Sequence, residues 1–83
     1  MEKISSGFKT PQDGWIFIQA GNDNEGYCYV SIDGSWVYWF QCDTTYKSTH
    51  ETDLIPCPKG SVITFGTHLY RDGFIDVYWM PNK

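Results

Sequence analysis

Charged residues, and basic ones above all, are scarce in this sequence. They make up 19% of its 83 residues, and six Lys and Arg stand against ten Asp and Glu, which gives a formal net charge of -4. Nucleic acids and anionic membrane surfaces are bound through clusters of Lys and Arg, and this sequence contains no such cluster. It also has no stretch near the roughly 20 apolar residues that span a bilayer. We therefore expect neither a nucleic-acid partner nor insertion into a membrane.

Motifs for catalysis and metal binding are missing as well. The sequence contains no glycine-rich phosphate loop, no G-x-S-x-G element and no H-E-x-x-H pair. Its three cysteines, Cys28, Cys42 and Cys57, form no C-x-x-C pair, and their odd number disfavours a disulfide framework. We expect them to be reduced and to fill space in strands. One disulfide plus a leftover thiol is the alternative.

The carboxylates need their own explanation, because seven aspartates are numerous enough for a paired-carboxylate glycosidase centre. Asp13, Asp33 and Asp72 each precede a glycine, a pattern that turn geometry explains. Asp76 falls inside an expected strand, and turns do not explain it. Residues 22–26 are rich in oxygen ligands but lack the distal Glu of a calcium loop. We expect a protein that is not an enzyme and that holds no metal or other cofactor.

Strand-forming residues dominate what the sequence does contain. Turn formers recur at intervals of roughly 8 to 12 residues, the segments between them are rich in Val, Ile, Thr and aromatic residues, and none shows a sustained helical period. The pattern predicts one all-β domain over residues 1–83, a small antiparallel β-sandwich of about six to eight strands. The main strands are expected at residues 14–20, 26–32, 35–42, 52–57, 61–68 and 74–80, with a short one near Ile4.

Two Asp-Gly pairs predict hairpins. Asp33 and Gly34 suit a type I′ turn, and residues 71–74 are expected to join the last two strands in the same way. With regular pairing from this turn, Val30 opposes Val37. The predicted core face is then Cys28, Val30, Ile32, Val37 and Trp39, and the opposite face carries Tyr27, Tyr29, Ser31, Trp36, Tyr38 and Phe40.

Aromatic residues reach 18% of the sequence, more than the core of so short a chain can hold. Both faces of the two expected hairpins are apolar, which favours burial on two sides. We therefore expect a homo-oligomer whose subunits cover the second faces. The alternative is that loops and residues 5–12 cover them within one chain.

The longest expected connection, residues 42–53, combines hydroxyl groups with aromatic and basic side chains, a composition typical of binding loops. Exposed Trp and Tyr rings also stack on the C–H faces of sugars, although the same rings can hold subunits together. The candidate receptor-binding residues come from this connection and from the two hairpins: Tyr46, Lys47, His50, Trp36, Tyr38, Tyr70 and Arg71.

Three segments carry a family resemblance: residues 8–15 (FKTPQDGW), 30–34 (VSIDG) and 55–62 (IPCPKGSV). In this order they resemble the small C-terminal tip domains of bacteriophage tail fibres, over about residues 8–80. The resemblance implies a jelly-roll-like β-sandwich of the C1q and tumour-necrosis-factor group, a homotrimer, and an extracellular location on the virion. It makes residues 1–7 a segment leading in from a longer fibre. Ser61 stands where the family commonly has an acidic residue.

The resemblance gives structural positions to two groups of residues. Pro11, Asp13, Gly14 and Trp15 would form the first corner, and Pro58, Lys59 and Gly60 the turn before the fifth strand. The function it implies is a non-enzymatic receptor-binding tip module that recognises a saccharide or protein on a bacterial surface. Two alternatives are a purely structural trimerisation or capping knob, and a carbohydrate-binding accessory module of a hydrolase.

Overall fold

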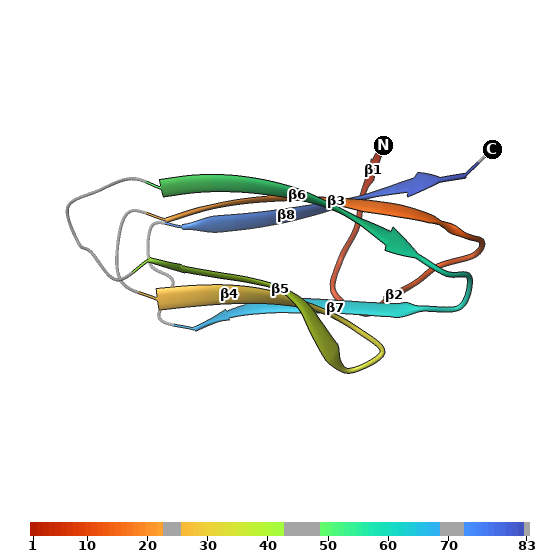
Figure 1. Ribbon diagram of the computed structural model, residues 1–83, viewed down its shortest axis with the longest axis horizontal. Coiled ribbons are helices and arrows are strands. Elements are labelled where there is room, and N and C mark those ends of the chain that lie inside the picture. Colours follow the sequence, from red (N-terminus) through yellow and green to blue (C-terminus); the bar gives the residue numbers. More distant parts are fainter. Residues whose placement is uncertain (23–25, 43–48, 69–72, 83) are drawn as a thin grey trace.

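The described residues form eight strands, which make up two four-stranded antiparallel sheets that pack face to face (Figure 1). The computed structural model describes residues 1–22, 26–42, 49–68 and 73–82. The prediction of an all-β sandwich is confirmed. The strands are β1 (Glu2–Lys3), β2 (Phe8–Lys9), β3 (Gly14–Asn22), β4 (Gly26–Ile32), β5 (Ser35–Cys42), β6 (Thr49–Cys57), β7 (Val62–His68) and β8 (Phe74–Pro81).

The strand order is β1-β8-β3-β6 in one sheet and β2-β7-β4-β5 in the other. Each strand of the first half pairs with one of the second half, β1 with β8, β2 with β7, β3 with β6 and β4 with β5. This is the order of a jelly roll, a long hairpin rolled into two sheets. Among the described residues, no helix is long and apolar enough to cross a membrane.

The predicted hairpin of the last two strands is wrong. β7 pairs with β2 and β4, whereas β8 pairs with β1 and β3 in the other sheet. The chain therefore crosses between the sheets after His68. An Asp-Gly pair predicts a change of direction, but it does not determine which strands then form hydrogen bonds.

The hairpin of β4 and β5 is confirmed at its turn and corrected beyond it. Asp33 and Gly34 have φ values of 53° and 86°, as a type I′ turn requires. The register then shifts between Ser31 and Val30 of β4: Ser31 opposes Trp36, whereas Val30 opposes Tyr38. Val37, which lies between these two partners, is an extra residue in β5. This is a β-bulge, and it moves every later side chain of β5 to the other face of the sheet.

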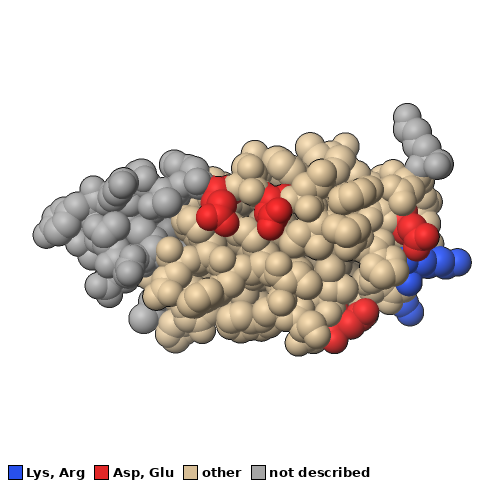
Figure 2. Space-filling model, viewed as in Figure 1, with Lys and Arg blue, Asp and Glu red and all other residues tan. Residues whose placement is uncertain are grey.

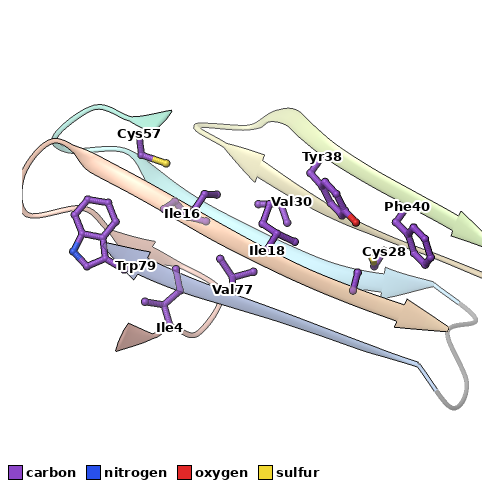
Figure 3. Close-up of a cluster of buried hydrophobic side chains, with 12 residues drawn as sticks. Ile4, Ile16, Ile18, Cys28, Val30, Tyr38, Phe40, Cys57, Val77 and Trp79 are labelled. Atoms are coloured by element: carbon purple, nitrogen blue, oxygen red, sulfur yellow. The ribbon is translucent and has the colours of Figure 1, made fainter. Parts of the chain in front are cut away.

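The bulge changes which side chains form the core. In β4, Cys28 and Val30 are buried as predicted. In β5 the predicted core residues Val37 and Trp39 are exposed, and Tyr38 and Phe40 are buried in their place. Figure 3 shows these two rings among the core side chains. The full set of buried apolar residues is Ile4, Ile16, Ile18, Ala20, Cys28, Val30, Tyr38, Phe40, Cys57, Ile63, Val77 and Trp79.

Two of the segments that carry the resemblance, residues 8–15 and 55–62, meet at the end of the sandwich where both termini lie (Figure 1). The hydroxyl of the buried Thr10 donates to the carbonyl of Pro58 at 2.8 Å and accepts from the N–H of Ser61 at 2.9 Å. The N–H of Lys59 donates to Oδ1 of Asp13 at 2.7 Å. We call residues 10–14 and 57–61 the corner.

Two further residues show how tightly the corner is built. Gly14 is buried, and a Cβ there would overlap the Trp79 ring and the carbonyl of Met80. Ser61 is 2% exposed, and its hydroxyl donates to the Pro58 carbonyl at 2.7 Å. A hydroxyl that reaches a neighbouring carbonyl fits this buried place, because its hydrogen-bonding group has a partner there. The serine at position 61 thus has a structural role in the corner.

Candidate functional site

A cluster of aromatic side chains covers the outer face of the β2-β7-β4-β5 sheet. We call it the platform and define it as Tyr27 and Tyr29 of β4, Trp36 and Trp39 of β5, and His68 of β7. Trp36 is 56% exposed and Trp39 53% exposed. Large rings with more than half of their surface in water are unusual on a folded protein unless they serve a contact.

The strands place these rings on one face for two different reasons. In β4 the side chains alternate, so Tyr27 and Tyr29 point away from the core residue Cys28 between them. In β5, Trp36 and Trp39 are three positions apart, and a regular strand would put them on opposite faces. The bulge adds one residue between them, and both indoles therefore reach the same outer face.

Tyr27 is the centre of the platform. Its ring centroid lies 6.2 Å from that of Trp36, 6.0 Å from that of Trp39 and 5.2 Å from that of His68. Tyr29 and Trp36 stack with centroids 4.8 Å apart and planes 7° apart. These contacts join rings from three neighbouring strands into one continuous surface held by rigid backbone.

The residues beneath the platform are small or hydroxylated. Gly66 of β7 pairs with Tyr29, and a Cβ at Gly66 would lie only 3.0 Å from the Tyr29 hydroxyl oxygen. A glycine therefore leaves the room that this ring occupies. Beside it, the hydroxyls of Ser31 and Thr64 are hydrogen-bonded to each other. Ser31 is buried although it points toward the platform side of β4.

Charge is distributed unevenly over the described part of the molecule. The outward positions of β4, β5 and β7 carry no Lys, Arg, Asp or Glu among the described residues. In the view of Figure 2 the basic side chains gather at the end that holds the corner. The platform therefore offers aromatic faces together with uncharged hydrogen-bonding groups, among them the exposed Gln41.

The structure changes the predicted set of site residues. Trp36 belongs to the platform, as its predicted place on the outer face implies. Tyr38 does not, because the bulge turns it into the core, where it is 6% exposed. The backbone of His50 pairs with Gly21 inside β6, which starts at Thr49, so His50 is not part of a loop as expected. Tyr46, Lys47, Tyr70 and Arg71 lie outside the described residues.

Sequence reasoning missed four members of the site: Tyr27, Tyr29, Trp39 and His68. The strand pattern places Tyr27 and Tyr29 on the outer face, but they are not among the candidate binding residues. The same pattern predicts Trp39 in the core, and a histidine in a strand, such as His68, in packing or a subunit contact. A Trp-x-x-Trp spacing next to a type I′ turn is compatible with one shared face only when the strand contains a bulge. No residue type in β5 indicates that bulge, so the bulge could not be predicted from the sequence.

The groups considered for chemistry have structural explanations. Asp76 is the carboxylate that turn geometry does not explain. It forms an ion pair with Lys3, with 3.0 Å between Nζ of Lys3 and Oδ1 of Asp76. The hydrogen bond and the charge of Asp76 raise the pKa of the Lys3 ammonium group. Burial raises the pKa of the Cys57 thiol. Within the described residues, no three His, Cys, Asp or Glu side chains come together as a metal site would need.

The outer face of the other sheet is also partly apolar. Phe17 and Tyr78 have ring centroids 6.3 Å apart, and Trp15 and Leu54 are 38% and 49% exposed. An open depression of about 460 Å³ lies beside Trp15; it is lined by Asp13, Gly14, Trp15, Pro56, Cys57, Pro58 and Asn82. The indole of Trp15 is the natural comparison for the two indoles of the platform.

Comparison with known proteins finds no family model, no curated protein and no solved structure that matches this chain. The candidate site therefore rests on the geometry of its own residues.

Proposed function

We propose that this protein is a non-enzymatic module that binds a saccharide on its aromatic platform. The observation that carries the proposal is that two half-exposed indoles and two phenol rings share one sheet face and contact one another. A sugar ring has C–H groups on its faces, which pack against aromatic rings, and hydroxyls at its edge, which need polar partners. The platform supplies both.

The anchoring of the platform rings on paired strands supports binding. All five side chains stand on strands, and Tyr27 contacts three of the other rings. Rings that are ordered before the ligand arrives lose little entropy when it binds. A nucleic acid would also stack on such rings, but it requires basic side chains around them, and the described outward positions of β4, β5 and β7 have none.

The resemblance supports a setting for this function. A tip domain of a phage tail fibre would use the platform to attach to a glycan on the bacterial surface, outside the cell and as part of the virion. Both termini lie at the corner end of the sandwich, so a longer fibre would join the domain there (Figure 1). Association into homotrimers stays a prediction of the resemblance.

The test is a glycan array followed by calorimetric titration of the best ligand. Trp36→Ala and Trp39→Ala should each weaken binding about tenfold or more, because each removes a large apolar contact surface. Trp15→Ala is the matched control, since it removes an exposed indole from the other sheet and should leave affinity unchanged. The proposal fails if folded Trp36→Ala and Trp39→Ala proteins bind glycans as the parent does.

The same measurements separate the alternatives. A trimerisation or capping knob would bind no glycan and would form a stable trimer in light scattering. An accessory module of a hydrolase would bind the polysaccharide that the hydrolase cleaves, as a monomer.

A further inference from the structure

The two indoles of the platform present two separate surfaces for a ligand. Trp36 is stacked on Tyr29 with near-parallel planes, so one face of this indole is covered. It is nevertheless 56% exposed, which means that its other face is open to solvent. This open face is large enough to pack against one sugar ring.

Trp39 offers the second surface. Tyr27 contacts both indoles and lies at 42° to Trp36 and at 64° to Trp39. A single pyranose ring covers one aromatic ring, so a ligand that uses both indoles must contain at least two sugars. Because the contacting rings are inclined to one another, a flat crystalline surface cannot lie against all of them. A single chain can, because successive sugars turn about the glycosidic bonds that join them.

The polar groups of the platform determine which sugars suit it. Gln41 and His68 flank Tyr27 in the neighbouring strands, and both side chains are exposed. Amide, imidazole and phenol groups donate and accept hydrogen bonds and therefore match sugar hydroxyls. A uronic acid or a phosphate on the chain would meet no Lys or Arg at the described outward positions of β4, β5 and β7. Over these three strands its charge would lose solvation without gaining an ion pair. Lys9 lies in β2, at the opposite edge of the sheet from β5.

We infer that the platform binds two or more linked sugars of a single, neutral glycan chain, with one sugar on Trp36 and another on Trp39. This inference rests on the proposed glycan-binding function and narrows its ligand. It separates the protein from modules that bind one terminal sugar, a charged glycan or the surface of a crystalline polysaccharide.

The test measures affinity against chain length. Calorimetry with fragments of one, two, three and six sugars, from neutral β-glucan, chitin, galactan and mannan, gives a length series for each polymer. In the series that binds, affinity should rise at least tenfold between one sugar and three and then level off. Trp36→Ala and Trp39→Ala should each abolish this rise, because either one leaves a single indole for the chain, and Trp15→Ala should leave the rise unchanged.

Several outcomes would overturn the inference. They are equal affinity for one sugar and for three, binding confined to oligogalacturonate or another anionic series, and Trp36-dependent adhesion to crystalline cellulose. In each case the proposed function survives if binding still depends on Trp36. If the folded protein binds no glycan at all, both the inference and the proposed function are wrong. A fall in oligomeric state of Trp36→Ala and Trp39→Ala in light scattering would mean that a second copy covers the platform, which also overturns the inference.

Discussion

The corner and the platform lie on the same sheet framework but use their residues in opposite ways. In the corner, polar side chains such as Thr10 are buried and each has a hydrogen-bond partner. On the platform, the largest apolar side chains, Trp36 and Trp39, remain more than half exposed. The comparison predicts that stability and the proposed glycan binding depend on different places in this small domain, and that each can be changed without the other.

Gly14→Ala should give the largest loss of stability. The added Cβ overlaps the Trp79 ring and the carbonyl of Met80, and overpacking of this kind costs up to about 3 kcal/mol. Urea denaturation measures the free energy of unfolding. Gly60→Asn is the comparison within the corner: a Cβ there meets nothing within 4 Å, so this variant should lose less, only the cost of a side chain at the positive φ of 83°. Equal losses in the two variants would mean that the corner is not tightly packed.

Thr10→Val should come next, with a loss of about 1 to 3 kcal/mol of unfolding free energy. The substitution keeps the shape of the side chain but removes the hydroxyl's hydrogen bonds to the Pro58 carbonyl and from the Ser61 N–H. The Pro58 carbonyl keeps the hydroxyl of Ser61, and the Ser61 N–H keeps a longer contact of 3.3 Å to that carbonyl. Thr67→Val, at an exposed position of β7, should change the unfolding free energy by less than about 0.5 kcal/mol. Glycan affinity of the folded Thr10→Val protein should equal that of the parent; a weakened affinity would break the separation of the two regions.

Trp36→Ala should cost only about 1 kcal/mol of stability, because the main interaction that it removes is the stack on Tyr29. The same variant is expected to lose most of its glycan binding. Thermal unfolding and calorimetric titration on one preparation test both halves of this expectation. A loss of stability as large as that of Gly14→Ala would show that the platform is a structural element.

The smallest effect is expected at the exposed ion pair of Lys3 and Asp76. The pKa of Lys3 is raised in the folded state, so the pair stabilises the fold below the ordinary lysine pKa of 10.5 and this contribution is lost as the pH rises above that value. Lys3→Met should therefore lower the melting temperature slightly at pH 7 and leave it unchanged at pH 11.5, relative to the parent. An equal difference at both pH values would mean that the ammonium charge is not the cause.

Local signals in the sequence predicted much of the fold. The bounds of β4 and β5, the type I′ turn at Asp33 and Gly34 and the burial of Cys28 follow from residue types whose preferences act within a few positions. The all-β sandwich follows from the regular spacing of turns, although the pattern predicts no strand at β2 (Phe8–Lys9). These features need no information about distant parts of the chain.

The candidate site was predicted only in part, for a physical reason that lies in residues 36–40. All five are apolar, so the alternation of polar and apolar residues that normally identifies the inner face of a strand is absent there. The inner face must then be predicted by counting positions from the turn, and the extra residue Val37 makes this count wrong by one position. In β7 and β8, too, polar and apolar residues do not alternate clearly, and nothing in the sequence indicates that these strands belong to different sheets.

The bulge at Val37 also means that the pairing of β5, and not only its composition, determines which rings form the outer surface. A strand that paired regularly from the turn would exchange the solvent-facing and interior rings beyond Trp36 without altering any amino acid. Deleting Val37 would instead remove the bulge and leave Trp36 and Trp39 on the same face, because the two indoles would then stand two positions apart. A domain of this kind could therefore lose the extra residue and keep its platform.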